Sequence, residues 1–333
     1  MSQKIKIIQY GLGPIGLKIT RHLMEKDNFE IVGAIDADPQ KVGMDVGELA
    51  DLAKPLGIVI SADPKLVLSQ SKADIVVLTT TSSLEEIDPQ ICEIIPYGVN
   101  VVSTCEELSY PWDANSQIAQ KIDEEAKIHN VSILGTGVNP GFLMDFLPTV
   151  TTGICRSVGK IRVERYQNAQ FRRLPFQKKI GAGLTVEQFR EKVKGKTLRH
   201  VGLTESMHMI ASKIGWRLNR TEDIVEPVIA EKNVSTSDMV IEPGNALGVN
   251  QVGRGYIGEE EVITLVFRAV IGETDPHDTI FIEGDPKIEM TIKDGVNGDT
   301  ATCSIAVNAI PVVINTSAGL KTMADIEPIS FFR

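Results

Sequence analysis

The chain has 333 residues, which exceeds the usual size of a single hydrophobic core and predicts two domains. Its formal net charge of −10 gives no basic surface for nucleic acid or an anionic membrane, so the expected partners are small molecules. There is no long uncharged apolar stretch and no cationic leader, and the cysteines are far apart in the sequence. These features favour reduced thiols, no metal site and a cytoplasmic protein.

A β-type run at residues 5–10 leads directly into a glycine-rich turn and then into a helical pattern over 14–26. The turn spells Gly-x-Gly-x-x-Gly, whose glycines allow a tight bend, close approach to a pyrophosphate and close packing of the helix on the strand. We expect this turn to bind the cofactor, with contacts from Gly11, Leu12, Gly13, Pro14, Ile15 and Gly16.

A second β-type run, 30–35, ends in Asp36, where a dinucleotide-binding sequence carries the acid that binds the adenosine ribose. Asp36 would accept hydrogen bonds from the 2′-hydroxyl and repel a 2′-phosphate, so the sequence favours NAD over NADP. Lys41 follows in the same loop and leaves NADP possible, although an ordinary solvated turn is the favoured interpretation of this segment.

Strand and helix patterns alternate over roughly the first 135 residues, which predicts a parallel, doubly wound sheet of the Rossmann type. The expected strands are 5–10, 30–35, 57–61, 74–80, 99–104 and 131–135, and the expected helices are 14–26, 84–95 and 114–129. After about residue 150, β-type runs at 159–166, 261–268 and 287–292 flank a long polar stretch and predict an α+β domain with a mainly antiparallel sheet.

The predicted domains are a dinucleotide-binding domain over 1–140 and a substrate-binding and dimerisation domain over 141–333, with about 300–333 packing back on the first. Ligands of such parallel sheets bind beyond the carboxyl ends of the strands. This rule adds cofactor contacts from Thr80, Thr81, Thr104 and Asn139. A large sheet with one uncovered face also favours a homodimer.

Two adjacent carboxylates, Glu106 and Glu107, follow the expected fifth strand and precede an aromatic stretch. A carboxylate desolvated beside aromatic groups suits a general base, although a surface pair at a helix start is an equally good interpretation of the spacing. Cys105 competes for the same place as the nucleophile of a semialdehyde dehydrogenase, but no histidine lies close in sequence to activate it.

Four segments carry a resemblance that spans nearly the whole chain: 101–111, 135–142, 199–206 and 307–311. In these segments the chain resembles 2,4-diaminopentanoate dehydrogenases and the related native amine dehydrogenases, with a fold similar to dihydrodipicolinate reductases. It lacks the paired-histidine motif of the reductases. The resemblance implies reversible, NAD(P)-dependent oxidative deamination of a primary amine to a ketone and ammonia. It also implies that Glu106 is the catalytic acid and base, with Glu107 as the reserve candidate, and that the protein is a homodimer.

Substrate contacts are expected in both domains. Asn139, Pro140, Gly141 and Phe142 would border the nicotinamide, and Tyr166 and Gln167 would line the cleft. Arg172 and Arg173, with Lys178 nearby, would hold a substrate carboxylate because guanidinium groups match carboxylates. His200 would contact the substrate or position Glu106, and a structural histidine is the alternative interpretation. The functional alternatives are the semialdehyde dehydrogenase and a non-catalytic NAD(H)-sensing protein.

Overall fold

The computed structural model describes residues 4–172 and 174–332 and divides the chain into two compact units. Unit 1 comprises Met1–Phe142 together with Gly298–Arg333, and unit 2 comprises Leu143–Asn297. In the described residues no helix is long and apolar enough to cross a membrane.

Unit 1 is built on a seven-stranded sheet in which every pairing is parallel, in the order β15-β6-β5-β4-β1-β2-β3. Its strands are β1 (Ile5–Tyr10), β2 (Phe29–Ile35), β3 (Ile60–Ser61), β4 (Ile75–Leu78), β5 (Asn100–Ser103), β6 (Ser132–Gly135) and β15 (Gly319–Lys321). The central strand β4 is buried along its whole length, as expected of a strand covered on both faces.

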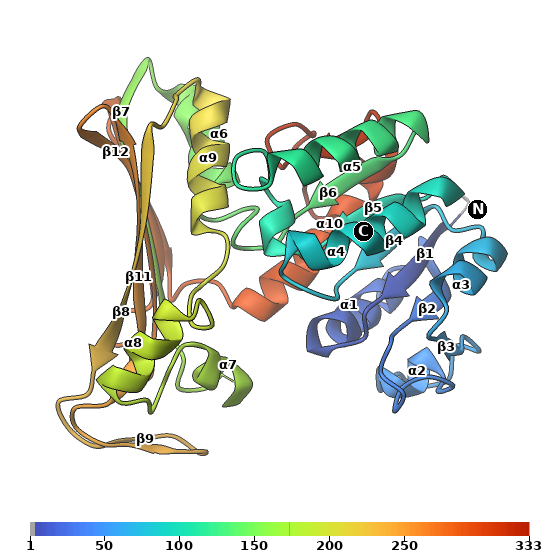
Figure 1. The fold of residues 1–333 in the computed structure, drawn as a ribbon, viewed down its shortest axis with the longest axis horizontal. Helices are drawn as coiled ribbons and strands as arrows, with labels where there is room; N and C mark the ends of the chain where they lie inside the picture. Colours follow the sequence, from blue (N-terminus) through green and yellow to red (C-terminus); the bar gives the residue numbers. More distant parts are fainter. Residues whose placement is uncertain (1–3, 173, 333) are drawn as a thin grey trace. The chain divides into compact units, whose positions relative to one another are not determined.

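Helices cover both faces of this sheet (Figure 1). The helices of unit 1 are α1 (Pro14–Met24), α2 (Val46–Leu49), α3 (Pro64–Ser71), α4 (Leu84–Ile94), α5 (Ser116–Ile128) and α10 (Gly298–Asn315). α1 and α10 pack together on one face, while α3, α4 and α5 enclose a hydrophobic core on the other. The strand order reverses between β1 and β4, and this switch point is where sheets of this type bind ligands.

Unit 2 contains a six-stranded sheet in the order β14-β13-β7-β12-β11-β8, in which only the β7–β12 pairing is parallel. Its strands are β7 (Ser157–Asn168), β8 (Arg220–Ile229), β11 (Ala246–Ile257), β12 (Glu260–Val270), β13 (His277–Asp285) and β14 (Ile288–Lys293). A separate two-stranded ribbon joins β9 (Val234–Ser235) to β10 (Val240–Ile241). The Rossmann-type sheet with a second, mainly antiparallel domain confirms the fold class predicted from the sequence.

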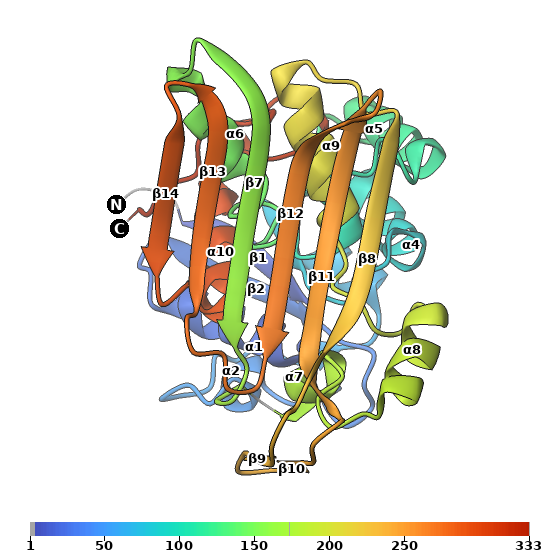
Figure 2. The ribbon, with the colours of Figure 1, turned by 90° about the vertical axis from the view of Figure 1, so that its left-hand side faces the viewer.

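Unit 2 has three helices in the polar stretch between the β-type runs 159–166 and 261–268, for which the sequence predicted no element, and one helix before these runs. They are α7 (Leu174–Lys179), α8 (Val186–Lys194) and α9 (Leu203–Ile214) in the stretch, and α6 (Phe146–Thr151) before it. α6 and α9 lie behind the sheet in Figure 2, and the opposite broad face carries no helix of the described part of unit 2. α8 begins with a capping box in which Thr185 and Gln188 satisfy each other's backbone amides, a local signal that the sequence contained.

A buried ion pair joins two strands on the helix-covered side of this sheet. Arg165 of β7 donates to the Asp278 carboxylate of β13 at 3.0 Å, and the two side chains are 1% and 6% exposed. Both groups also bind the backbone of Val296, which fixes the turn that follows β14. Burial lowers the pKa of Arg165 and raises that of Asp278, so desolvation opposes the charged form of each partner.

We predict that Asp278→Ala lowers the free energy of unfolding of unit 2 by about 3–5 kcal/mol, because it leaves a buried guanidinium without its counter-charge. Hydrogen exchange of the β7 and β13 amides in increasing urea measures the change. The double variant Arg165→Met, Asp278→Leu should recover most of the loss, and Arg156→Ala, which breaks an exposed pair, should change little. Equal effects of Asp278→Ala and Arg156→Ala would contradict this role.

Candidate active site

The glycine-rich turn connects β1 to α1 and has the shape that a dinucleotide phosphate requires. Gly11 has φ +92°, and a Cβ at Gly16 would lie 2.0 Å from the Gly11 carbonyl oxygen, so helix and strand meet more closely than any side chain permits. Nothing lies within 4 Å of a Cβ built on Gly13, and no side chain caps the start of α1. The turn therefore offers backbone amides beside open space, which fits a pyrophosphate.

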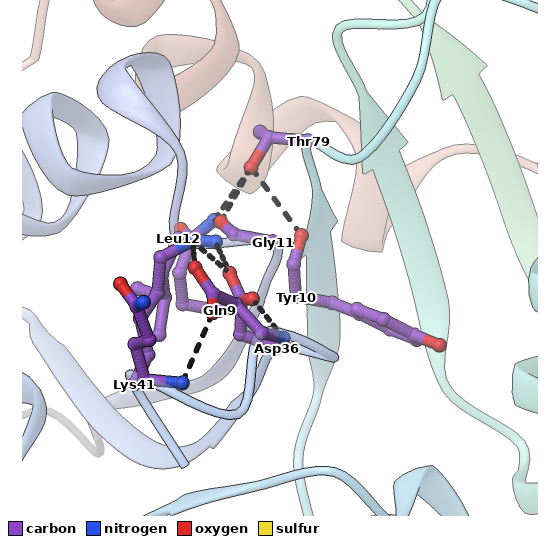
Figure 3. A network of polar contacts seen from close by, with 9 residues as sticks. Gln9, Tyr10, Gly11, Leu12, Asp36, Lys41 and Thr79 are labelled. Atoms are coloured by element: carbon purple, nitrogen blue, oxygen red, sulfur yellow. Dashed lines mark hydrogen bonds and ion pairs between the residues drawn. The ribbon is translucent and has the colours of Figure 1, made fainter. Parts of the chain in front are cut away.

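A buried glutamine that the sequence analysis missed holds this turn in place (Figure 3). The side-chain amide of Gln9 donates to the Gly11 carbonyl at 2.9 Å and to the Thr79 hydroxyl at 3.0 Å. The Thr79 hydroxyl in turn donates to the Gly11 carbonyl at 2.8 Å. Thr79 directly follows β4, so the network ties the turn to the neighbouring strand. The signal in the sequence was a polar residue inside the apolar strand 5–10.

Asp36 follows β2 and lies beside the same turn (Figure 3). Its carboxylate accepts from the amides of Leu12 at 2.7 Å and Asp38 at 2.9 Å, and from Lys41 at 3.1 Å. Burial alone would raise the pKa of Asp36, but these amides and the Lys41 ammonium outweigh it and lower the pKa below its ordinary value. Asp36 is therefore an anion beside the turn that fits the cofactor phosphates.

The remaining cofactor candidates of unit 1 lie after β4, β5 and β6, at the carboxyl edge of the sheet. Thr80 and Thr81 donate their hydroxyls to Gln90 at 2.7 Å and Glu86 at 2.5 Å, so both side chains are tied to α4. The Thr104 amide donates to the Leu78 carbonyl at 3.2 Å. Unit 1 thus brings these residues to one edge, but the two threonine hydroxyls already have side-chain partners.

The segment after β6 carries the predicted nicotinamide border, Asn139, Pro140, Gly141 and Phe142, which also ends the first segment of unit 1. Asn139 is 8% exposed, and the neighbouring Val138 amide donates to Thr302 of α10 at 3.2 Å. The C-terminal helix therefore supports this loop directly.

The two adjacent glutamates of the 3-10 turn Glu106–Leu108 have different surroundings. The Glu107 carboxylate accepts from the Leu84 amide at 2.8 Å and so binds the first residue of α4, while the Glu107 amide donates to Ser82. In the described part of the chain, the half-buried Glu106 carboxylate takes part in no hydrogen bond or ion pair. The helix N-terminus holds one carboxylate and leaves the other available.

Cys105 is a small buried side chain of the core. It is 1% exposed, and burial raises the pKa of its thiol to about 12. A thiol with this pKa is protonated at neutral pH and is a poor nucleophile. All four cysteines are free, and the described residues contain no cluster of three or more potential metal ligands.

Unit 2 carries the other predicted substrate contacts, and two of these, Tyr166 and His200, lie on opposite faces of its sheet. His200 stacks on Phe267 with ring centroids 4.2 Å apart, whereas Tyr166 stacks on His277 at 4.6 Å. Phe267 pairs with Arg165 in the sheet, and side chains of adjacent residues alternate between faces, so Tyr166 lies on the face opposite to His200. Of the two strand-end residues expected to line the cleft, Tyr166 therefore lies on the face opposite to His200, whereas Gln167 lies on the same face as Arg165 and His200.

The remaining predicted substrate contacts of unit 2 are His200 and the arginines Arg172 and Arg173. Burial, then the charges of Lys179 and Arg165, lower the pKa of His200 to about 3, which favours the neutral imidazole at physiological pH. The Arg172 guanidinium lies over the Phe176 ring at 4.0 Å, in a loop whose carbonyls are held by the buried Gln177. Arg173 lies outside the described residues.

Comparison with known proteins matches the two parts of the chain to two families. Residues 142–331 match the 2,4-diaminopentanoate dehydrogenase C-terminal domain, and residues 5–104 match the dihydrodipicolinate reductase N-terminus. The chain is 33% identical to the 2,4-diaminopentanoate dehydrogenase of Acetoanaerobium sticklandii, over 97% of this chain and 94% of that protein. The chain belongs to the 2,4-diaminopentanoate dehydrogenase family.

Two further relatives carry the name amine dehydrogenase. The structure of the enzyme from Mycobacterium smegmatis matches with a TM-score of 0.88 at 25% identity, covering 99% of this chain and 98% of that one. The enzyme from Streptomyces virginiae is 21% identical over 97% of this chain and 96% of its own length. The chain is accordingly a nicotinamide-dependent oxidoreductase that acts on an amine, which confirms the function predicted from the sequence.

We predict that Asp36→Ala weakens NAD binding by about 1.5–3 kcal/mol, because it removes a charged acceptor for the ribose 2′-hydroxyl. NADP should lose less affinity, since the same change removes an anion that repels the 2′-phosphate. Titration of both cofactors by fluorescence measures the difference, with Asp38→Ala as a matched control in the same loop. Equal weakening of both cofactors would contradict the assignment of Asp36 to the ribose.

Proposed function

We propose that this protein catalyses the reversible oxidative deamination of 2,4-diaminopentanoate or a related primary amine with NAD, and with NADP as a second cofactor. The products are a ketone, ammonia and the reduced cofactor. The observation that carries the proposal is that the two glutamates after β5 differ in their hydrogen bonds. Glu107 binds the start of α4, whereas the Glu106 carboxylate has no hydrogen bond or ion pair with any residue that the structure describes and lies at the edge where sheets of this type bind ligands.

The chemistry requires a base at this place. An ammonium ion cannot lose hydride until a proton is removed from its nitrogen, and the Glu106 carboxylate takes that proton. The nicotinamide ring supplies the hydride acceptor. Glu106 passes that proton to solvent and is a carboxylate again when hydride leaves, so it stabilises the positive charge of the iminium that forms on the substrate. Glu106 then takes a proton from the water that attacks the iminium carbon and gives it to the nitrogen of the resulting carbinolamine. Ammonia leaves as the carbinolamine hydroxyl loses its proton and becomes the ketone carbonyl.

Substrate contacts are proposed within each unit taken by itself. In unit 1 the backbone and rings of Asn139, Pro140 and Phe142 border the nicotinamide. In unit 2 Arg172 and Arg173 hold a substrate carboxylate, and His200 contributes a neutral hydrogen-bonding group rather than a charge. Tyr166 lies on the other face of the unit 2 sheet from His200, so we do not group it with His200.

We further propose that the protein is a cytoplasmic homodimer. The broad face of the unit 2 sheet that carries no helix of the described chain supports a second copy as its cover (Figure 2). The four free cysteines support a reducing compartment.

A panel of amines and aldehydes tests the reaction class. With NAD and 2,4-diaminopentanoate the protein should release ammonia and reduced cofactor in equal amounts, without added metal, flavin, phosphate or coenzyme A. A semialdehyde dehydrogenase would oxidise an aldehyde and lose activity on thiol alkylation, which the buried Cys105 argues against. An NAD(H) sensor would bind the cofactor and turn over nothing in the panel.

We predict that Glu106→Gln leaves NADH binding nearly unchanged while turnover falls by about 10²–10⁴, the usual contribution of general acid–base catalysis. Glu107→Gln is the matched control, because a glutamine oxygen can still accept from the Leu84 amide. Steady-state rates at saturating cofactor, with NADH binding followed by fluorescence, measure both. Near-normal turnover of Glu106→Gln, or a larger loss in Glu107→Gln, would overturn the assignment.

A further inference from the structure

Lys41 lies in the turn after β2, and its ammonium is paired with two aspartates. Its side chain is 24% exposed, and the ammonium lies 3.1 Å from Asp36 and 3.5 Å from Asp38. The backbone of the loop is fixed as well, because the amides of Lys41 and Val42 donate to the Asp38 carbonyl at 2.9 and 3.1 Å. The loop thus presents one lysine directly at the carboxylate assigned to the ribose (Figure 3).

The hydrogen bonds of Asp36 leave room for a hydroxyl but not for a phosphate. A carboxylate has about four acceptor positions, and three are used by the amides of Leu12 and Asp38 and by Lys41. A ribose 2′-hydroxyl can donate to the remaining position. A 2′-phosphate offers no such donor and carries negative charge, so Asp36 alone would reject it.

Lys41 differs from the other two partners of Asp36 in that it can move. Its ammonium is a point charge on a flexible four-carbon stem, whereas the two amides belong to the fixed backbone. The Lys41 ammonium lies 3.1 Å from the Asp36 carboxylate. A 2′-phosphate on a ribose held by Asp36 would lie close to that ammonium, so a small rotation of the lysine stem would carry the ammonium from Asp36 to the phosphate while both amides stay on the carboxylate.

We propose that Lys41 is the residue that determines whether this enzyme accepts NADP. With NAD it neutralises Asp36, and with NADP it leaves Asp36 and binds the 2′-phosphate. The proposal rests on the proposed nicotinamide-dependent function, but its test needs only binding of the adenosine half of the cofactor.

Calorimetric titration of the full chain with adenosine 2′,5′-bisphosphate and with AMP compares ligands that differ only in the 2′-phosphate. Lys41→Gln should raise the Kd of the bisphosphate about 10–100-fold and change the Kd of AMP by less than about threefold, as expected for loss of one charge-assisted contact. Lys41→Arg should retain most of the bisphosphate affinity. Lys127→Gln is the matched control, since it removes a lysine paired with an aspartate on α5, and it should change neither Kd.

Equal weakening of both ligands by Lys41→Gln would show that Lys41 only supports the loop and would overturn the proposal. Unchanged affinity for the bisphosphate would overturn it as well. If the wild-type protein binds both adenosine phosphates but oxidises no amine, the proposed function fails while the comparison of the two Kd values still decides the role of Lys41. If it binds neither phosphate, the assignment of Lys41 falls together with the cofactor site.

Discussion

The close approach of α1 to β1 is the constraint on which unit 1 depends. It forces glycine at positions 11 and 16 and leaves the Gly11 carbonyl inside the protein, where it must be paired. The Gln9 amide and the Thr79 hydroxyl pair with it, and Thr79 brings the end of β4 to the turn. On the other side the Leu12 amide binds Asp36 and brings the end of β2 to the same place. One turn thus aligns three strand ends at the point where the strand order reverses.

Three carboxylates at this edge of the sheet have different roles because their surroundings differ. Asp36 is held anionic by two amides and a lysine beside the glycine-rich turn. Glu107 is bound at the start of α4, where the helix dipole favours a negative charge. Glu106 has no such partner in the described chain and remains available as a base. Sequence spacing alone could not separate the two glutamates, since the Leu84 amide that binds Glu107 is 23 residues away.

The fold was predictable where local pattern and burial agree. Within the first 135 or so residues, the bounds of β1 and α4 were predicted to within one residue. Apolar runs that end at a glycine or another turn residue are a clear signal for buried parallel strands and the helices between them.

The elements of unit 2 were predicted less completely. β8 is an edge strand with no fully buried residue, so its hydrophobic pattern is weak, and its sheet is built from contacts distant in sequence. α8 carried a capping box and an amphipathic pattern that the prediction did not use. Tyr166 and Gln167 were predicted together, but adjacent residues of a strand point to opposite faces, so only Gln167 shares the His200 face. The sequence contains Gln9, Asp36 and Lys41 but does not show their contacts. Gln9 binds Thr79 at the end of another strand, and Lys41 meets Asp36 only once the loop between them has folded.

A crystal structure of the complex with NADH and an unreactive amine tests the central claim, which is that Glu106 is the base and Glu107 the helix cap. The account predicts a Glu106 carboxylate oxygen within about 3 Å of the amine nitrogen, which itself faces the nicotinamide C4. It also predicts that Glu107 remains on the Leu84 amide. A complex in which Glu107 leaves α4 to meet the amine, or in which Glu106 points away from the nicotinamide, would contradict the account.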